Sequence, residues 1–264
     1  MRKSILEESI HLVRTVGDFI REAHTSFSMD DIEHKGFNDL VSYVDKEAEK
    51  RLVEGCRKIF PEAGFIAEEG TAEEISTRYR WIIDPVDGTT NFVHGLPIFA
   101  ISLALADQDD IIIGIVYEIG RDELFHARRG DGAFCNGHQI RISDVKSLDQ
   151  SLLATGFPYY DFGQMPIYLD ILNDFMQNTH GLRRLGSAAV DLAYTACGRF
   201  EGFFEYNLNA WDVAAGILLV EEAGGKATDF SGGNNALFGR EIIAAGNVHA
   251  SMMKIIQSHW QRTN

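Results

Sequence analysis

The sequence predicts a mixed α/β protein made of two sub-regions, and two observations carry this prediction. Short apolar and β-branched runs separated by Gly, Asp and Asn turns fill the middle of the chain, a pattern typical of antiparallel strands. Beyond about residue 150 strands and helices alternate, which is typical of α/β units. We expect one domain over residues 1–264, with sub-regions of about 1–145 and 146–264, because no repeat or linker divides the chain.

Two amphipathic helices and five strands are expected in the first sub-region. Apolar side chains recur every three or four residues through residues 6–20 and 48–59, and Pro61 ends the second helix. The strands are expected at residues 65–67, 79–83, 99–106, 111–117 and 123–127, with a hairpin at the polar residues 107–110 and turns at 35–38, 130–132 and 136–137. Since Pro85 cannot donate to a β-ladder, the second strand should stop at Asp84.

The second sub-region should begin with a strand at residues 152–155. Helices are expected at 165–178, 187–197, 211–222 and 248–261, with strands at 184–185, 202–206 and 242–245. Gly224 and Gly225 match the end of the third of these helices. Residues 213–220 are almost wholly apolar, so that helix should be deeply packed.

Composition excludes several classes of protein. The net charge of −15 argues against a nucleic-acid surface and against attraction to anionic membranes. Cys56, Cys135 and Cys197 form no zinc or redox spacing, so they are interpreted as free thiols. The start of the chain does not resemble a signal peptide, and no apolar run has the length of a membrane span. We therefore expect a cytoplasmic protein.

Residues 84–92, Asp-Pro-Val-Asp-Gly-Thr-Thr-Asn-Phe, are the most informative stretch. Asp84, the carbonyl of Val86 and Asp87 offer the oxygen ligands that Mg²⁺ prefers. Gly88 allows a tight turn, and Thr89 and its neighbours can begin a helix whose amides attract phosphate. Asp-Pro-x-Asp-Gly alone is more often only a turn, but the strand before it and the two threonines after it favour a metal site beside a phosphate site.

Acids elsewhere in the chain can complete this site. Glu68 and Glu69 end a predicted strand, where they could point into a crevice, although a solvated loop is the commoner explanation. Asp212 starts the apolar helix, where it could instead simply stabilise the first turn. A phosphate would be repelled by so acidic a chain unless bound cations reversed the local charge, so a metal and an anionic substrate are expected together.

Three segments resemble the signatures of the inositol monophosphatase family: Glu68-Glu69, residues 81–94 and residues 211–225. The similarity runs through nearly the whole chain. It implies a layered αβαβα sandwich of the sugar-phosphatase type, with a mixed or antiparallel N-terminal sheet and a smaller C-terminal α/β part. It also implies two or three Mg²⁺ ions, lithium inhibition and hydrolysis of a phosphomonoester.

The resemblance also assigns residues to roles. Glu68, Asp84 and the Val86 carbonyl match ligands of one metal, and Asp84, Asp87 and Asp212 match ligands of a second. Gly88 and Thr89 match the phosphate cradle, and Asp45 matches an acid that pairs with the Thr89 hydroxyl. The positions that contact the polyol in relatives correspond to Asp87, Ser187, Ala188, Glu205 and Asp212, and Lys35 corresponds to a residue on a loop.

The expected mechanism is in-line attack by a metal-activated water, with Glu68 or the Thr89–Asp45 pair drawing its proton away. We expect an inositol-1-monophosphatase that releases myo-inositol and phosphate. Activity on histidinol phosphate, fructose 1,6-bisphosphate or a 3′(2′),5′-bisphosphate nucleotide is the alternative on the same fold. A binding or regulatory protein that retains the metal site is the alternative without catalysis.

The expected partner is a small phosphomonoester, with no nucleic acid and no membrane. A homodimer is implied by the resemblance alone. Arg183 and Arg184 could reach a substrate from a neighbouring subunit, but surface arginines are commoner.

Overall fold

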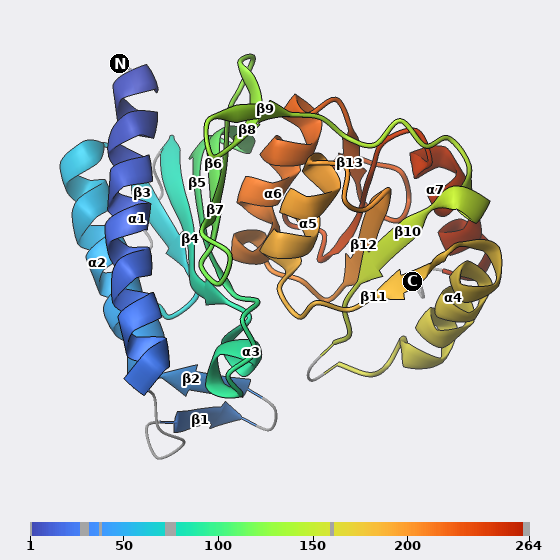
Figure 1. The fold of residues 1–264 in the computed structure, drawn as a ribbon, viewed down its shortest axis with the longest axis horizontal. Helices are drawn as coiled ribbons and strands as arrows, with labels where there is room; N and C mark the ends of the chain where they lie inside the picture. Colours follow the sequence, from blue (N-terminus) through green and yellow to red (C-terminus); the bar gives the residue numbers. More distant parts are fainter. Residues whose placement is uncertain (1, 27–31, 37–38, 72–77, 159–160, 261–264) are drawn as a thin grey trace.

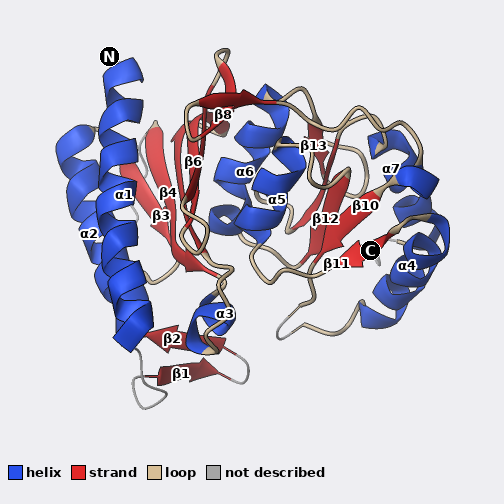
Figure 2. Cartoon of the chain, in the orientation of Figure 1, coloured by secondary structure: helices blue, strands red, loops and turns tan. Residues whose placement is uncertain are grey.

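Helices and sheets alternate through the molecule in five layers. The computed structural model describes residues 2–26, 32–36, 39–71, 78–158 and 161–260. α1 (Arg2–Ser26) and α2 (Tyr43–Ile59) cover one face of a seven-stranded sheet (Figure 1). α5 (Ala188–Ala196) and α6 (Ala210–Glu222) lie between it and a five-stranded sheet, whose far face is covered by α4 (Met165–Asn178) and α7 (His249–His259) (Figure 2). The mixed α/β class and its αβαβα layers are confirmed.

The seven-stranded sheet has its strands in the order of the chain, from β3 to β9. Only β3 and β4 pair in parallel; from β4 to β9 neighbouring strands are antiparallel, with residues 88–99 connecting β4 to β5 and short turns joining the strands that follow. The strands are β3 (Gly64–Ala67), β4 (Tyr79–Asp87), β5 (Ala100–Asp107), β6 (Asp110–Glu118), β7 (Glu123–Arg128), β8 (Gly132–Cys135) and β9 (His138–Ile140). Sequence reasoning found the first five and took the last two only as turns.

The five-stranded sheet has the order β11-β10-β12-β14-β13. Its strands are β10 (Leu152–Thr155), β11 (Gly181–Arg183), β12 (Gly202–Tyr206), β13 (Lys226–Thr228) and β14 (Glu241–Ala245). The strand expected at residues 184–185 lies instead at β11, because Leu182 and its neighbours pair in parallel with β10. A small hairpin of β1 (Ile32–Gly36) and β2 (Asp39–Ser42) precedes α2, so Lys35 and Gly36 end a strand, and residues 37–38 of the expected turn lie outside the described residues.

One prediction about β4 was wrong. The strand does not stop at Asp84 but continues to Asp87, with a shift in its pairing to β5 between these two residues. Pro85 falls inside this bulge, where the ladder needs no N–H donor. The bulge ends at Gly88, and the short helix α3 (Thr89–Val93) follows.

Three apolar clusters fill the spaces between the layers, one under α1 and α2, one around α5 and α6, and one under α4 and α7. α6 is buried along residues 213–220, as its apolar sequence predicts, because a sheet lies on each side of it. The layers approach closely: a Cβ on Gly114 of β6 would lie 2.8 Å from the carbonyl oxygen of Ala215 on α6. Small residues at this crossing set the spacing of the central layer.

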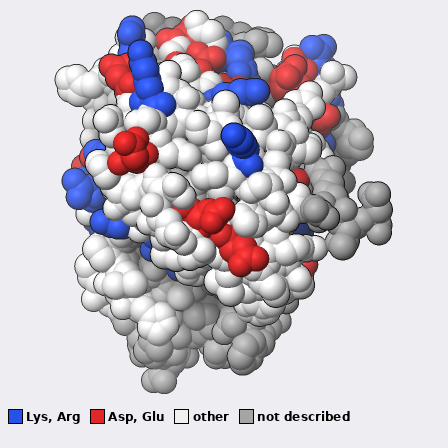
Figure 3. Space-filling model, turned by 90° about the vertical axis from the view of Figure 1, so that its right-hand side faces the viewer, with Lys and Arg blue, Asp and Glu red and all other residues white. Residues whose placement is uncertain are grey.

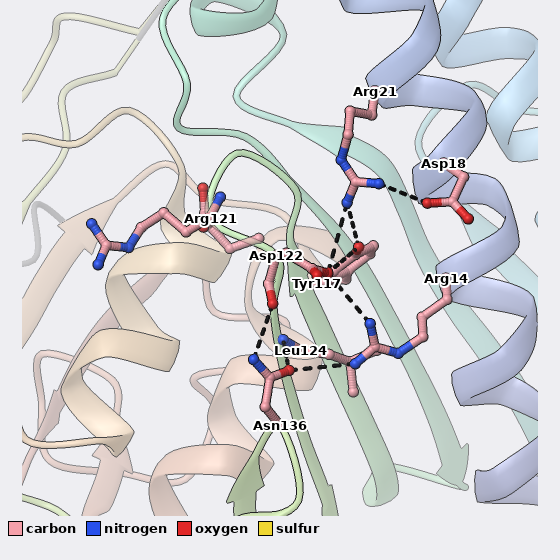
Figure 4. Close-up of polar contacts among 9 residues, drawn as sticks. Arg14, Asp18, Arg21, Tyr117, Arg121, Asp122, Leu124 and Asn136 are labelled. Carbon is pink, nitrogen blue, oxygen red and sulfur yellow. Dashed lines mark hydrogen bonds and ion pairs between the residues drawn. The ribbon is translucent and has the colours of Figure 1, made fainter.

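Two parts of the surface differ in character: a polar network joins α1 to the seven-stranded sheet, and the face over α4 and α7 exposes apolar side chains. Arg14 of α1 donates to Asp122 at 3.3 Å, and the Tyr117 hydroxyl donates to the same carboxylate at 2.6 Å, which ties α1 to the β6–β7 turn (Figure 4). Over α4 and α7 charged side chains are scattered between uncharged atoms (Figure 3), and the exposed apolar residues there include Leu169 and Met176. Among the described helices none is long and apolar enough to cross a membrane.

Candidate functional site

The structure brings nearly all the predicted site residues to one pocket. It lies where the bulge of β4, α3, the starts of α5 and α6 and the ends of β10 and β12 meet. The predicted residues that line it are Glu68, Asp84, Val86, Asp87, Gly88, Thr89, Ser187, Ala188, Glu205 and Asp212. Asp45, on α2, lies behind Thr89. The structure does not describe the side chain of Lys35.

The bulge of β4 fixes the first acid and the hydroxyl beside it. The N–H of Val86 donates to Asp84 Oδ1 at 3.0 Å. The Thr89 hydroxyl lies 2.9 Å from Asp45 Oδ1 and 3.0 Å from the carbonyl oxygen of Val86, and its single hydrogen serves one of these acceptors at a time. Thr89 therefore has the acidic partner that the resemblance implies.

Gly88 turns the chain between β4 and α3. Its φ of 99° lies in the left-handed region, which glycine adopts without strain. A Cβ at this position would lie 3.0 Å from the carbonyl oxygen of Ile98 and 3.2 Å from that of Gly186. The turn leaves the first amides of α3 at the pocket, because the first N–H groups of a helix have no partner within it.

Asp87 is held by the start of α5. Its Oδ2 accepts hydrogen bonds from the Ser187 hydroxyl at 2.7 Å and from the N–H of Ala189 at 2.6 Å. Burial raises the pKa of Asp87 to about 6, although these two hydrogen bonds oppose the rise. The Ser187 hydroxyl is thus used to orient Asp87, a role that sequence reasoning did not foresee.

Three further acids share this pocket. Asp212 accepts a hydrogen bond from the N–H of Asn209 at 2.7 Å, which completes a capping box at the start of α6. Burial, with the charge of Asp87, raises its pKa to about 7. Burial and mutual repulsion also raise the pKa values of Glu68 and Asp84 well above their usual range, and a hydrogen bond joins these two carboxyl groups.

The donor set fits hard divalent cations. Its atoms are carboxylate and carbonyl oxygens, which Mg²⁺ prefers, and a bound cation would oppose the burial and mutual repulsion that raise the pKa values of these acids. In the part of the chain that the structure describes, no three side chains are yet grouped as metal ligands. Glu68 and Asp84 lie close enough for the charge of Glu68 to raise the pKa of Asp84, and a cation between them would relieve their repulsion.

The other end of the pocket contains residues that sequence reasoning passed over. Arg184 is the only basic side chain among the described residues that line it; it is exposed, as expected for a surface arginine, and it also borders the pocket. Asp191 lies one helical turn beyond Ser187 on α5, and burial and the charge of Glu205 raise its pKa well above the usual range. The sequence signal that could have revealed Asp191 is the presence of a single acid within the mostly apolar helix α5.

Glu49 is a second acid that was overlooked. It is fully buried on α2, one turn after Asp45. Its carboxylate accepts hydrogen bonds from the N–H of Glu69 at 2.7 Å, from the N–H of Thr71 at 2.8 Å and from the Thr71 hydroxyl at 2.7 Å. Glu49 therefore fixes the segment that directly follows Glu68.

An oxygen-rich acid cluster lies beside a glycine turn and a helix start, between two packed sheets, and its chemistry fits hard cations and an anion. Comparison with known proteins agrees with this class. The model of the inositol monophosphatase family matches residues 1–263. The chain is 43% identical over 256 residues to the putative Nus factor SuhB of Neisseria meningitidis serogroup B, covering 96% of this chain and 98% of that protein.

A second relative is the inositol-1-monophosphatase of Rhizobium meliloti, 41% identical over 261 residues and covering 97% of each chain. The crystal structure of the extragenic suppressor protein suhB from Bartonella henselae superposes with a TM-score of 0.91 at 38% identity, covering 97% of this chain and 99% of that one. This protein belongs to the inositol monophosphatase family.

Proposed function

We propose that this protein is a Mg²⁺-dependent phosphomonoester hydrolase that releases myo-inositol and phosphate from inositol 1-phosphate. The observation that carries the proposal is the convergence of Glu68, Asp84, Asp87 and Asp212 on one pocket beside Gly88 and Thr89. These four acids would hold two or three ions, together with the carbonyl of Val86. Membership of the family supports phosphatase activity.

The chain's own groups account for the remaining parts of the reaction. Bound Mg²⁺ would supply the charge that makes water acidic and neutralises the phosphate. The Thr89 hydroxyl can pass its hydrogen to Asp45 and accept one from the attacking water, and Glu68 is the alternative acceptor. The amides of Gly88 and Thr89 would donate to the phosphate oxygens. Glu205 and the backbone at Ala188 would orient the polyol, while Ser187 holds Asp87 in place.

A phosphate-release assay tests this function. The substrates are myo-inositol 1-phosphate, fructose 1,6-bisphosphate, histidinol phosphate and 3′-phosphoadenosine 5′-phosphate, each with and without Mg²⁺ and with and without lithium. We expect the highest kcat/KM for the inositol phosphate, dependence on Mg²⁺, and inhibition by lithium. Asp84→Asn should lose most activity and keep the fold, so wild-type turnover by that purified variant would contradict the assignment.

The names of some relatives support a second candidate. Proteins 42 to 43% identical to this chain are named Nus factor or putative Nus factor SuhB. The second candidate is that this chain is a binding or regulatory protein that retains the site, in line with relatives that are named for a role other than hydrolysis. Release of phosphate from none of the four substrates would favour this candidate. We further propose that the protein is cytoplasmic and forms a homodimer. Light scattering of the purified protein would test the oligomeric state.

A further inference from the structure

Asp191 is a buried acid with an oxygen that has no donor. It lines the pocket from α5, and its side chain is 1% exposed. Among the described residues no hydrogen-bond partner reaches its Oδ1. A buried polar atom without a partner costs about 1–3 kcal/mol, and such atoms in native proteins are few. An atom of this kind at a pocket wall indicates a partner that arrives with a ligand.

Glu205 provides a second acceptor beside Asp191. It lies on β12, is 7% exposed and lines the same end of the pocket, and its charge acts on Asp191. Gly156, at the end of β10, makes room for it, because a Cβ there would overlap the Glu205 carboxylate. This end of the pocket is therefore shaped around two carboxyl groups.

Arg184 limits the charge of a ligand at this end. Its guanidinium acts electrostatically on both Asp191 and Glu205, so a cationic partner for the two acids is already present in the chain. An ammonium group on the ligand would compete with this arginine. An anionic group would face two carboxyl groups and one guanidinium. A neutral group that donates hydrogen bonds meets neither cost.

We propose that Asp191 extends the polyol contact expected at Glu205 into a subsite, and that its unpartnered oxygen accepts a hydrogen bond from a further hydroxyl group of a neutral polyol leaving group. This inference rests on the proposed function and adds Asp191 as a residue that determines specificity. It assigns to the unpartnered oxygen a hydroxyl donor that arrives with the substrate. Asp191 and Glu205 are not among the proposed metal ligands, although the charges of Asp87 and Asp212 act on them, so loss of Asp191 should affect hydroxylated substrates selectively.

The test compares two substrates on the same variants. One is myo-inositol 1-phosphate, and the other is 4-nitrophenyl phosphate, whose leaving group carries no further hydroxyl. We expect Asp191→Ala to raise KM for the inositol phosphate about tenfold, roughly the worth of one hydrogen bond, and to leave kcat/KM for the aryl phosphate within about twofold. Asp191→Asn keeps one acceptor oxygen and should lose less.

Two further variants separate binding from folding. Thr195 is buried one turn beyond Asp191, and its hydroxyl donates to the Asp191 carbonyl at 2.9 Å, so Thr195→Ala controls for damage to α5 and should leave both substrates unchanged. Gly156→Ala should displace the Glu205 carboxylate and reproduce the selective loss.

The outcomes distinguish the subsite from the function on which it rests. Equal losses on both substrates in Asp191→Ala would assign Asp191 to the scaffold of the site and overturn the subsite. So would an unchanged KM for the inositol phosphate. A wild-type protein that hydrolyses the aryl phosphate but not the inositol phosphate would instead overturn the proposed substrate, and the polyol assignment of the subsite with it.

Discussion

Replacing Glu49 with Gln should loosen the segment that carries Glu68. The carboxylate uses one oxygen for the N–H of Glu69 and the other for the N–H and hydroxyl of Thr71. A glutamine keeps one acceptor oxygen, so it can serve Thr71 only by turning its NH₂ group toward the N–H of Glu69. A buried donor then faces another donor directly beside a proposed metal ligand.

The size of the effect follows from that lost bond. Leaving a buried donor without its acceptor costs about 1–3 kcal/mol, so we expect the free energy of unfolding to fall by about 2 kcal/mol. In the alternative case the fold keeps its stability while Glu68 becomes less well positioned. The same free energy then weakens metal binding, and the dissociation constant for Mg²⁺ should rise by up to about thirtyfold. Calorimetric titration with Mg²⁺ and denaturant unfolding measure the two quantities.

A matched control exists on the same helix. Glu47 faces solvent and pairs with Arg51 at 2.8 Å, so Glu47→Gln removes an acid from α2 without touching the segment after Glu68. Surface pairs of this kind contribute little, and this variant should behave as the wild type. Wild-type stability and Mg²⁺ affinity in Glu49→Gln would refute the positioning role. Equal changes in both variants would refute it as well, because they would reflect net charge alone.

Three other predictions concern the proton path, pH and packing. Asp45→Asn should lower kcat by about a hundredfold with little change in Mg²⁺ affinity, measured by kinetics and calorimetry, because Asp45 acts through the Thr89 hydroxyl. Burial raises the pKa of Glu118 from 4.5 to about 7. Between these values the unfolded chain has lost a proton that the native state keeps, so this residue should destabilise the fold as pH rises, by about 3 kcal/mol at most. Glu118→Gln should remove that contribution in unfolding measured across pH. Gly216→Ala would place a Cβ 2.5 Å from Leu192 Cβ and should cost about 1–3 kcal/mol in denaturant unfolding.

Each of these predictions has an outcome that would contradict it. If Asp45 and Thr89 act as one path, Thr89→Val should match Asp45→Asn and the double variant should lose little more, whereas fully additive losses would separate them. Identical pH slopes for Glu118→Gln and the wild type would show that Glu118 titrates normally. Unchanged stability of Gly216→Ala would show that α5 and α6 can move apart without cost.

Several acids that line the pocket could be predicted because they lie in continuous motifs. Asp84 and Asp87 flank the bulge of β4 and Asp212 lies in the first turn of α6, and the local sequence suggests their roles before any tertiary contact is known. Glu49 could not be found in that way, and the sole local signal for Asp191 is its place on an otherwise apolar stretch of helix. Each is one acid on a helix, and whether it is buried depends on which distant segment packs against that face.

The same distinction applies to the fold. Long apolar periodicities predicted the helices and the longer strands, whereas β8, β9 and β13 have three or four residues and depend on their neighbours for pairing. The bulge in β4 was missed for a related reason. Its position is set by the register with β5, and the sequence of β4 alone shows only a proline that cannot donate.

The central layer of α5 and α6 gives the two halves of the chain a shared core. The backbone passes from the seven-stranded sheet to the five-stranded one through residues 141–151, yet α6, from the second half, is packed against β4, β5 and β6 of the first. A cut in that connection would sever the backbone while the shared core still held both fragments together. The pocket, with acids from each half, would survive as a site assembled from two chains.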